Sequence, residues 1–214
     1  TMMNIEAFEQ LPLLGILRGI ESKHVEPIAI AVAKTGLPAL EITMNTPNAP
    51  ALIKEMKYYS RGKFSVGAGT VLTFRDLDAA VAAGASFIVM PSLQLEVIRI
   101  CVSQKIPVFP GAFTPTEIYK AWEMGATMVK VFPSSIVGPS YFGEIKGPFN
   151  SIKLLACGGI TKQTISDFFT KGADAAAFGA SIFKKEWIDT ENYDAIGNEI
   201  SGLIHAYNAI EKDL

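Results

Sequence analysis

Two charged residues lie inside runs of apolar residues, where charge is rare. Glu41 belongs to the segment Ala39–Thr43, and Lys130 belongs to the segment Met128–Phe132. Glutamate and lysine are almost never fully buried unless they are paired. One interpretation is a buried ion pair that joins two strands, but such pairs stabilise proteins poorly. The other is chemistry: burial lowers the pKa of a lysine ammonium, and a neutral lysine attacks a carbonyl carbon to form a Schiff base.

A carboxylate next to such a lysine can move the protons that imine and enamine formation require. We therefore predict that Lys130 is the nucleophile and Glu41 the general acid/base. This pairing is typical of a class I aldolase mechanism.

Two glycine-containing turns follow the last two apolar segments. The first is Cys157-Gly158-Gly159, and the second is Gly179-Ala180-Ser181. Glycine lets an anion approach the backbone N–H groups closely. In a (β/α)8 barrel the loops after strands 7 and 8 often bind a phosphate group. We predict a phosphate site formed by Gly158, Gly159, Gly179 and Ser181, with tight strand-to-helix turns as the simpler reading.

Two further residues at strand ends are candidates for binding a substrate anion. The stretch Gly67-Ala68-Gly69-Thr70 lacks the complete spacing of a dinucleotide fingerprint. It can present the Thr70 hydroxyl and nearby amides to a carboxylate, or be an ordinary turn. Arg18 can form a bidentate pair with a carboxylate or phosphate, or be a solvated surface residue.

Other catalytic chemistries find little support. His24 and His205 lie in helical patterns away from strand ends, so we expect them to be surface or packing residues. The two cysteines, Cys101 and Cys157, are too few for a disulfide framework or a metal site. We expect both to be reduced, buried thiols, and we predict neither a metal nor a cofactor.

Short apolar segments recur along the chain and read as strands of a parallel sheet covered on both faces. They are Leu13–Leu17, Ala39–Thr43, Phe64–Ala68, Phe87–Met90, Val108–Phe109, Met128–Phe132, Lys153–Ala156 and Ala175–Phe178. Helical patterns lie between and after them, at His24–Thr35, Pro50–Tyr59, Arg75–Ala83, Leu95–Gln104, Thr116–Met124, Thr164–Lys171 and Tyr193–Lys212.

Four of these helices end at a glycine that precedes the next strand, namely Gly36, Gly84, Gly125 and Gly172. Glycine at this place is typical of a left-handed helix terminus. The repeat is therefore strand–helix, and eight such units predict an α/β fold, a (β/α)8 TIM barrel. The alternative is an open, doubly wound sheet.

The composition is that of a globular protein. Of 214 residues, 49% are hydrophobic and 19% are charged, and we predict a single barrel domain over residues 1–214. The net charge of −2 shows no excess of positive charge of the kind that binds nucleic acid. There is no run of 18 apolar residues for a membrane span, and the first ten residues do not read as a secretory signal, so we expect a cytoplasmic protein.

The order of these motifs resembles the 2-keto-3-deoxy-6-phosphogluconate (KDPG) aldolase / 4-hydroxy-2-oxoglutarate aldolase family. The matching stretches span about residues 11–185. They are Leu40-Glu41-Ile42-Thr43, Val66–Leu72, Phe109-Pro110-Gly111, Thr114–Glu117, Lys130-Val131-Phe132-Pro133, Lys146–Phe149 and Gly158-Gly159-Ile160.

The resemblance implies a homotrimeric barrel that cleaves a phosphorylated keto acid into pyruvate and glyceraldehyde 3-phosphate. It places Lys130 at the Schiff base, Glu41 at the acid/base and Thr70 at the pyruvyl carboxylate. It adds Pro91 and Phe132 as pocket-lining residues. Its phosphate loops fall on Gly158, Gly159, Gly179 and Ser181.

Two positions depart from the family's pattern. Asn45 stands where many members have an arginine that contacts the carboxylate, and Arg18 is the residue that could replace it. Cys157 stands where the family often has threonine. The galactonate epimer and 4-hydroxy-2-oxoglutarate thus remain alternative substrates. A metal-free phosphosugar isomerase or decarboxylase, and a non-catalytic phosphosugar-binding barrel, are the competing functions.

Overall fold

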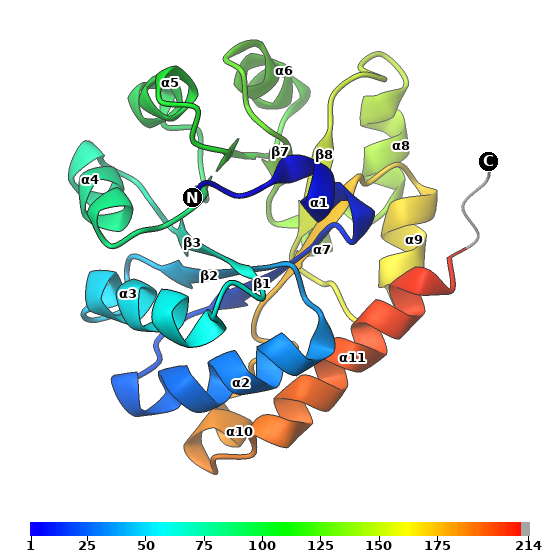
Figure 1. Ribbon diagram of the computed structural model, residues 1–214. Coiled ribbons are helices and arrows are strands. Elements are labelled where there is room, and N and C mark those ends of the chain that lie inside the picture. Colours follow the sequence, from blue (N-terminus) through cyan, green and yellow to red (C-terminus); the bar gives the residue numbers. More distant parts are fainter. Residues whose placement is uncertain (211–214) are drawn as a thin grey trace.

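The computed structural model describes residues 1–210, and its centre is one parallel sheet rolled into a barrel (Figure 1). Nine strand segments hydrogen-bond in the order β5-β4-β3-β2-β1-β9-β8-β7-β6. Their bounds are β1 Leu13–Leu17, β2 Ala39–Thr43, β3 Ser65–Gly69, β4 Ile88–Val89, β5 Val108–Phe109, β6 Gly111–Ala112, β7 Val129–Val131, β8 Leu154–Cys157 and β9 Ala175–Phe178.

Pro110 separates β5 from β6, and together these two segments form the fifth strand. Proline has no N–H group to give to a strand ladder, so the strand is interrupted there. On one side, Met90 N–H donates to the Phe109 carbonyl. On the other side, Lys130 N–H donates to the Pro110 carbonyl at 2.9 Å. The fifth strand therefore bonds to β4 and β7, which closes an eight-stranded barrel.

Most helices surround this barrel on the outside, and α1 lies across one of its ends (Figure 1). The helices are α1 Ile5–Gln10, η1 Ser22–His24, α2 Val25–Thr35, α3 Ala49–Ser60, α4 Phe74–Ala82, α5 Leu95–Ser103, α6 Pro115–Glu123, α7 Ser134–Val137, α8 Ser140–Lys146, α9 Ile165–Thr170, α10 Lys185–Asp189 and α11 Tyr193–Asn208. Thr73 and Thr114 begin α4 and α6 with capping boxes, in which the threonine oxygen accepts from the backbone N–H of Asp76 or Glu117.

The four glycines at helix ends have the conformation that the sequence pattern predicts. Gly36, Gly84, Gly125 and Gly172 have φ angles of 78°, 93°, 92° and 102°. These angles lie in the region that side chains with a Cβ atom avoid. Each glycine thus turns the chain from an outer helix back into an inner strand.

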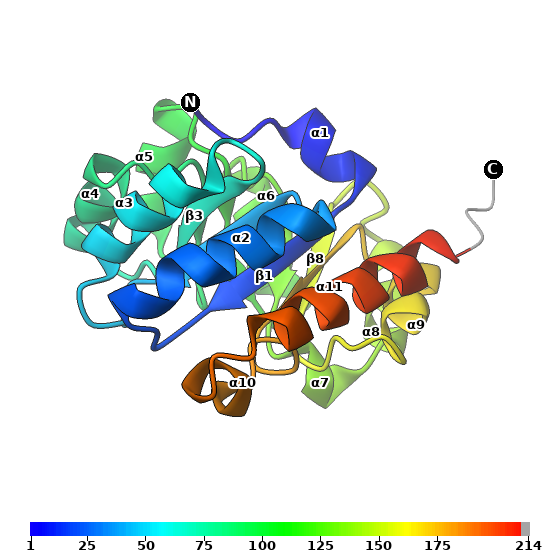
Figure 2. The same cartoon turned by 60° about the horizontal axis from the view of Figure 1, so that its bottom comes forward.

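Two hydrophobic clusters fill the molecule, one inside the barrel and one between strands and helices. The inner cluster includes Leu14, Phe87, Phe109 and Leu155. Phe8 of α1 belongs to it too, with its ring 6.0 Å from that of Phe109 in an edge-to-face contact. Helix α1 therefore covers the amino ends of the strands, opposite α7 and α10 (Figure 2).

The structure confirms the predicted (β/α)8 barrel, and the open doubly wound sheet does not form. All eight predicted strands exist, with ends that are identical to the prediction or differ by one residue, and the fifth strand has the additional segment β6. The closing helix α11 ends at Asn208. The predicted helix range 193–212 and the predicted domain 1–214 both extend into residues 211–214, which lie outside the described part of the chain. Helices α1, α7, α8 and α10 were not predicted. In residues 1–210 no helix is long and apolar enough to cross a membrane.

Candidate active site

Strand alternation points the two predicted catalytic side chains into the barrel. Successive side chains of a strand face opposite sides, so residues two apart share a side. Ala39 and Met128 belong to the inner cluster, and Glu41 and Lys130 lie two residues beyond them. Cys157, at the end of β8, also belongs to that cluster. The three side chains therefore meet near the carboxyl ends of the strands.

Glu41 is almost completely buried, with 1% of its surface exposed. Its Oε2 atom has no hydrogen-bond partner among residues 1–210. Burial raises the pKa of the Glu41 carboxyl from about 4.5 to about 7, against the opposing effect of the positive charges of Lys130 and Arg18. A carboxyl group with this pKa can both give and accept a proton near neutral pH.

Lys130 is 6% exposed, and its ammonium lies 5.0 Å from the centre of the Phe132 ring. Within residues 1–210, Lys130 and Glu41 do not form an ion pair, although the positive charge of Lys130 lowers the pKa of Glu41. The buried ion pair weighed above is therefore not formed. The Lys130 charge thus lowers the pKa of Glu41 without a direct ion pair.

Cys157 takes part in the same electrostatic cluster. Its thiol is buried, which raises its pKa, while the side chains of Lys130 and Arg18 act in the opposite direction. The thiol therefore carries a proton at neutral pH. Both Cys157 and Cys101 are buried and unbridged, as expected from the sequence.

Cys157 lines a cavity of about 310 Å³, whose lining includes neither Glu41 nor Lys130. The cavity brings together six of the predicted substrate-binding residues, namely Arg18, Phe132, Gly158, Gly159, Gly179 and Ser181. None of the hydrogen bonds that link turns and loops in residues 1–210 uses the backbone N–H of Gly158, Gly159, Gly179 or Ser181. The four residues line a cavity large enough for a small anionic ligand. The Ser181 hydroxyl itself donates to the Ile160 carbonyl and ties the two turns together.

Thr70 and Pro91 lie outside the lining of this cavity. Thr70 follows β3 with a positive φ of 54°, an uncommon conformation for a β-branched residue. Pro91 follows β4, and its carbonyl packs against Gly111. Both stand at the carboxyl ends of strands, as predicted, and their contact with substrate stays a prediction.

Two residues that the sequence did not single out shape the site. A Cβ atom at Gly69 would lie 2.1 Å from Glu41 Oε1, so the carboxyl group rests directly on the backbone of β3. Ser134 is fully buried, donates to the Val131 carbonyl, and accepts the Cys157 N–H at 3.0 Å. It thereby fixes the end of β7 against the end of β8. The only signal in the sequence for the contact between Gly69 and Glu41 was Gly69 itself, a glycine at the end of a predicted strand.

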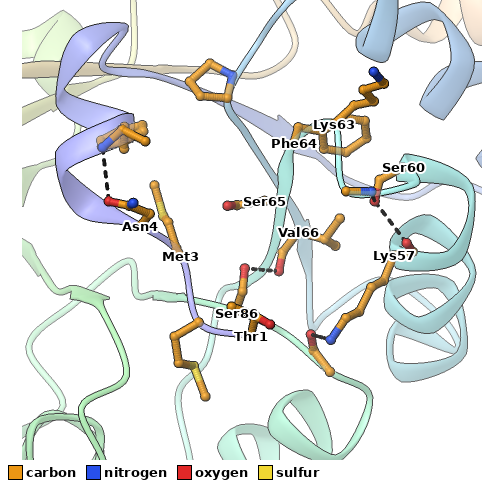
Figure 3. A pocket seen from close by; sticks show the side chains of 16 residues that line it. Thr1, Met3, Asn4, Lys57, Ser60, Lys63, Phe64, Ser65, Val66 and Ser86 are labelled. Atoms are coloured by element: carbon orange, nitrogen blue, oxygen red, sulfur yellow. Dashed lines mark hydrogen bonds between the residues drawn. The ribbon is translucent and has the colours of Figure 1, made fainter.

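A second cavity, of about 480 Å³, lies at the amino ends of the strands beside α1 (Figure 3). Met3, Lys57, Ser65 and Ser86 are among its lining residues. It lies at the end of the barrel opposite the carboxyl ends of the strands, where Lys130, Glu41 and Cys157 meet, so it is not where their chemistry takes place. His24 pairs with the Tyr193 hydroxyl at 2.8 Å, which is a packing role, and His205 is exposed. Residues 1–210 hold no cluster of His, Cys, Asp or Glu suited to a metal ion.

Comparison with known proteins identifies this arrangement. The family model of the KDPG and KHG aldolases matches residues 5–199. The chain belongs to this family. It is thus an aldolase, a carbon–carbon lyase built on a TIM barrel.

Individual relatives of this aldolase carry two substrate names. The chain is 36% identical to the 2-dehydro-3-deoxy-6-phosphogalactonate aldolase of Escherichia coli K12, over 82% of this chain and 86% of that one. It is 30% identical to the 2-dehydro-3-deoxy-phosphogluconate aldolase of Haemophilus influenzae, over 95% of this chain and 96% of that one. A solved KDPG aldolase from Legionella pneumophila, with pyruvate captured as a covalent carbinolamine, superimposes with a TM-score of 0.83 at 26% identity, covering 90% and 93%.

Proposed function

We propose that this aldolase forms a Schiff base on Lys130 and cleaves 2-keto-3-deoxy-6-phosphogluconate to pyruvate and glyceraldehyde 3-phosphate. One observation carries the proposal: a buried lysine and a buried carboxyl group with a raised pKa lie close to Cys157, which lines a cavity together with the glycine turns. The lysine suits the keto group, and the turns suit the phosphate. The carbinolamine in the Legionella relative supports the same chemistry.

The reaction begins when the unprotonated amine of Lys130 attacks the C2 ketone to give a carbinolamine. Glu41 donates a proton to the departing hydroxyl, and water leaves as the imine forms. Glu41, now a carboxylate, accepts the proton of the C4 hydroxyl, directly or through a water molecule. The C3–C4 bond breaks, and its electron pair moves into the protonated imine. Protonation of the resulting enamine at C3 and hydrolysis release pyruvate and regenerate Lys130.

The galactonate epimer is the second candidate substrate. The E. coli relative named for that substrate is the more identical of the two curated relatives above. Asn45 also stands where many members of the family have an arginine, so a different contact to the carboxylate is expected. Unphosphorylated 4-hydroxy-2-oxoglutarate, which would give pyruvate and glyoxylate, is the third candidate.

A pyruvate-release assay on these three substrates, coupled to lactate dehydrogenase, tests the proposal. We expect the highest kcat/KM with the gluconate-derived phosphate ester and no release by Lys130→Met. A higher value with the galactonate ester would move the assignment to that epimer. Binding of all three without release would instead favour a non-catalytic phosphosugar-binding barrel. Turnover retained by Lys130→Met would favour an isomerase or decarboxylase that needs no Schiff base.

The family resemblance also supports a homotrimer that works in the cytoplasm. Exposed apolar side chains near the carboxyl ends of the strands, such as Phe74 and Ile136, would be covered by other copies of the chain. Light scattering after gel filtration is expected to give a mass about three times the 23.1 kDa of one chain. A mass of one chain would contradict the trimer.

A further inference from the structure

Arg18 lines the substrate cavity but has no side-chain anchor. It is exposed and makes no hydrogen bond or ion pair within residues 1–210. Among the described residues that line this cavity, it is the only cation. It lines the same cavity as Cys157, and its positive charge lowers the pKa of both Cys157 and the buried Glu41. The backbone that carries Arg18 must therefore supply its placement.

The next residue, Gly19, is where that backbone is held. The Gly19 N–H donates to the Thr46 Oγ1 atom at 3.0 Å. Gly19 also has a positive φ of 67°, so the chain turns sharply directly after Arg18. This bond connects the loop after β1 to the loop after β2, across 27 positions of sequence.

Thr46 is itself fixed from the strand that carries Glu41. It is 3% exposed, and its Oγ1 atom lies 3.1 Å from the Oγ1 atom of Thr43. Thr43 is completely buried at the end of β2, two residues beyond Glu41, so both side chains face the barrel interior. The contact between the two hydroxyls and the hydrogen bond from Gly19 thus connect β2, which carries Glu41, to the loop after β1, which carries Arg18.

From this chain of contacts we infer that Thr46 is a positioning residue, which holds Arg18 over the cavity so that the guanidinium binds the anionic substrate. The inference rests on the proposed function, because it requires an anionic keto acid in the cavity. Thr46 does not touch the reacting atoms. Its loss should weaken substrate binding and leave bond cleavage nearly unchanged.

The test compares Thr46→Val, which keeps the shape but loses the oxygen acceptor, with Thr46→Ser, which keeps the acceptor. With the best phosphorylated substrate, we expect Thr46→Val to raise KM about three- to tenfold and to change kcat less than twofold. Thr46→Ser should restore the wild-type KM. Thr35→Val is a matched control, because Thr35 Oγ1 accepts a backbone N–H, from Leu37, at the opposite end of β2.

The same substitution in an Arg18→Met background shows whether Thr46 acts through Arg18. We expect Thr46→Val to raise KM no further in that background. An unchanged KM in Thr46→Val, or an equal rise in both backgrounds, would overturn the inference. Melting temperatures report on folding, and Thr46→Ala serves as a second variant if the valine form does not fold. Wild-type protein that releases no pyruvate from any of the three substrates would sink the proposed function instead.

Discussion

Burial gives Glu41 both its reactivity and its energetic cost. The carboxyl is 1% exposed, has an Oε2 atom without a hydrogen bond in the described part of the chain, and rests on Gly69 of the neighbouring strand. Water and protein donors would normally stabilise a carboxylate, and here only the more distant charges of Lys130 and Arg18 do so. The result is a group that exchanges protons near neutral pH and destabilises the folded chain when it ionises.

The first prediction concerns the pH dependence of stability. The pKa of Glu41 is about 7 in the folded chain against an ordinary value of 4.5, so the unfolded chain loses this proton first as pH rises. Ionisation of Glu41 therefore lowers the free energy of unfolding between pH 4.5 and 7, by on the order of 3 kcal/mol in all. Glu41→Gln should be more stable than wild type at pH 8.

Urea titrations at pH 8 and pH 4.5 measure this difference. The gain should be present at pH 8 and vanish at pH 4.5, where Glu41 is protonated in the folded chain. A variant that is equally or less stable than wild type at pH 8 would show that Glu41 is not a destabilising buried carboxyl.

The second prediction concerns Gly69. A methyl group there would overlap the Glu41 carboxyl, which is the flexible end of its side chain and can move aside. Gly69→Ala should therefore fold normally but lose about a hundredfold in kcat, because the carboxyl is displaced by about 1 Å. Gly67→Ala is the contrasting variant, since its methyl group would meet the buried Phe87 ring and should reduce stability. Wild-type kcat in Gly69→Ala would rule out a precisely placed Glu41.

At the residue scale, the sequence predicted the charged pair because charge stands out among apolar neighbours. It also placed Gly158, Gly159, Gly179 and Ser181 at one cavity, since the carboxyl ends of parallel strands converge. Gly69 and Thr46 could not be assigned, because their partners, Glu41 and Gly19, lie 28 and 27 positions away and become neighbours only through strand register and loop packing.

At the scale of elements, the two ends of the barrel do different work. Short helices such as α7 and α10 follow the strands at the end that holds the cavity. Helix α1 covers the other end, where Phe8 completes the interior cluster. Substitutions at the covered end should therefore change stability and spare the chemistry.

Phe8→Ala tests whether the end of the barrel covered by α1 contributes to stability and not to catalysis. Phe8 is 1% exposed and packs against Phe109, so its loss should lower the free energy of unfolding by about 3–5 kcal/mol. We expect kcat to stay within twofold of wild type. Met2→Ala, at an exposed side chain of the same segment, should change stability by less than about 0.5 kcal/mol. A large loss of kcat in folded Phe8→Ala would contradict the division.

The sequence predicted the elements with strong periodic signals and missed those without them. The glycines that end α2, α4, α6 and α9 marked the repeat, and the capping threonines marked two helix starts. Helices α1, α7 and α10 span six, four and five residues. Such short helices carry too little periodicity to be distinguished from loops, and packing against the barrel determines them.

At the scale of the whole molecule, the barrel buries a lysine and a carboxyl close to Cys157, which lines the cavity at the carboxyl ends of the strands. Closure through the interrupted fifth strand is what brings β7 and its Lys130 round toward β2 and its Glu41. The two residues are 89 positions apart in the sequence. The amine and the carboxyl therefore act together only in the closed barrel.

The central claim is that Lys130 forms a covalent imine with the keto acid. Wild-type protein incubated with pyruvate and borohydride, then analysed by peptide mass spectrometry, tests it most directly. We predict that the peptide containing Lys130 gains the mass of reduced pyruvate, and that Lys130→Met gains none. A wild-type protein without this adduct, or an adduct that persists in Lys130→Met, would contradict the claim.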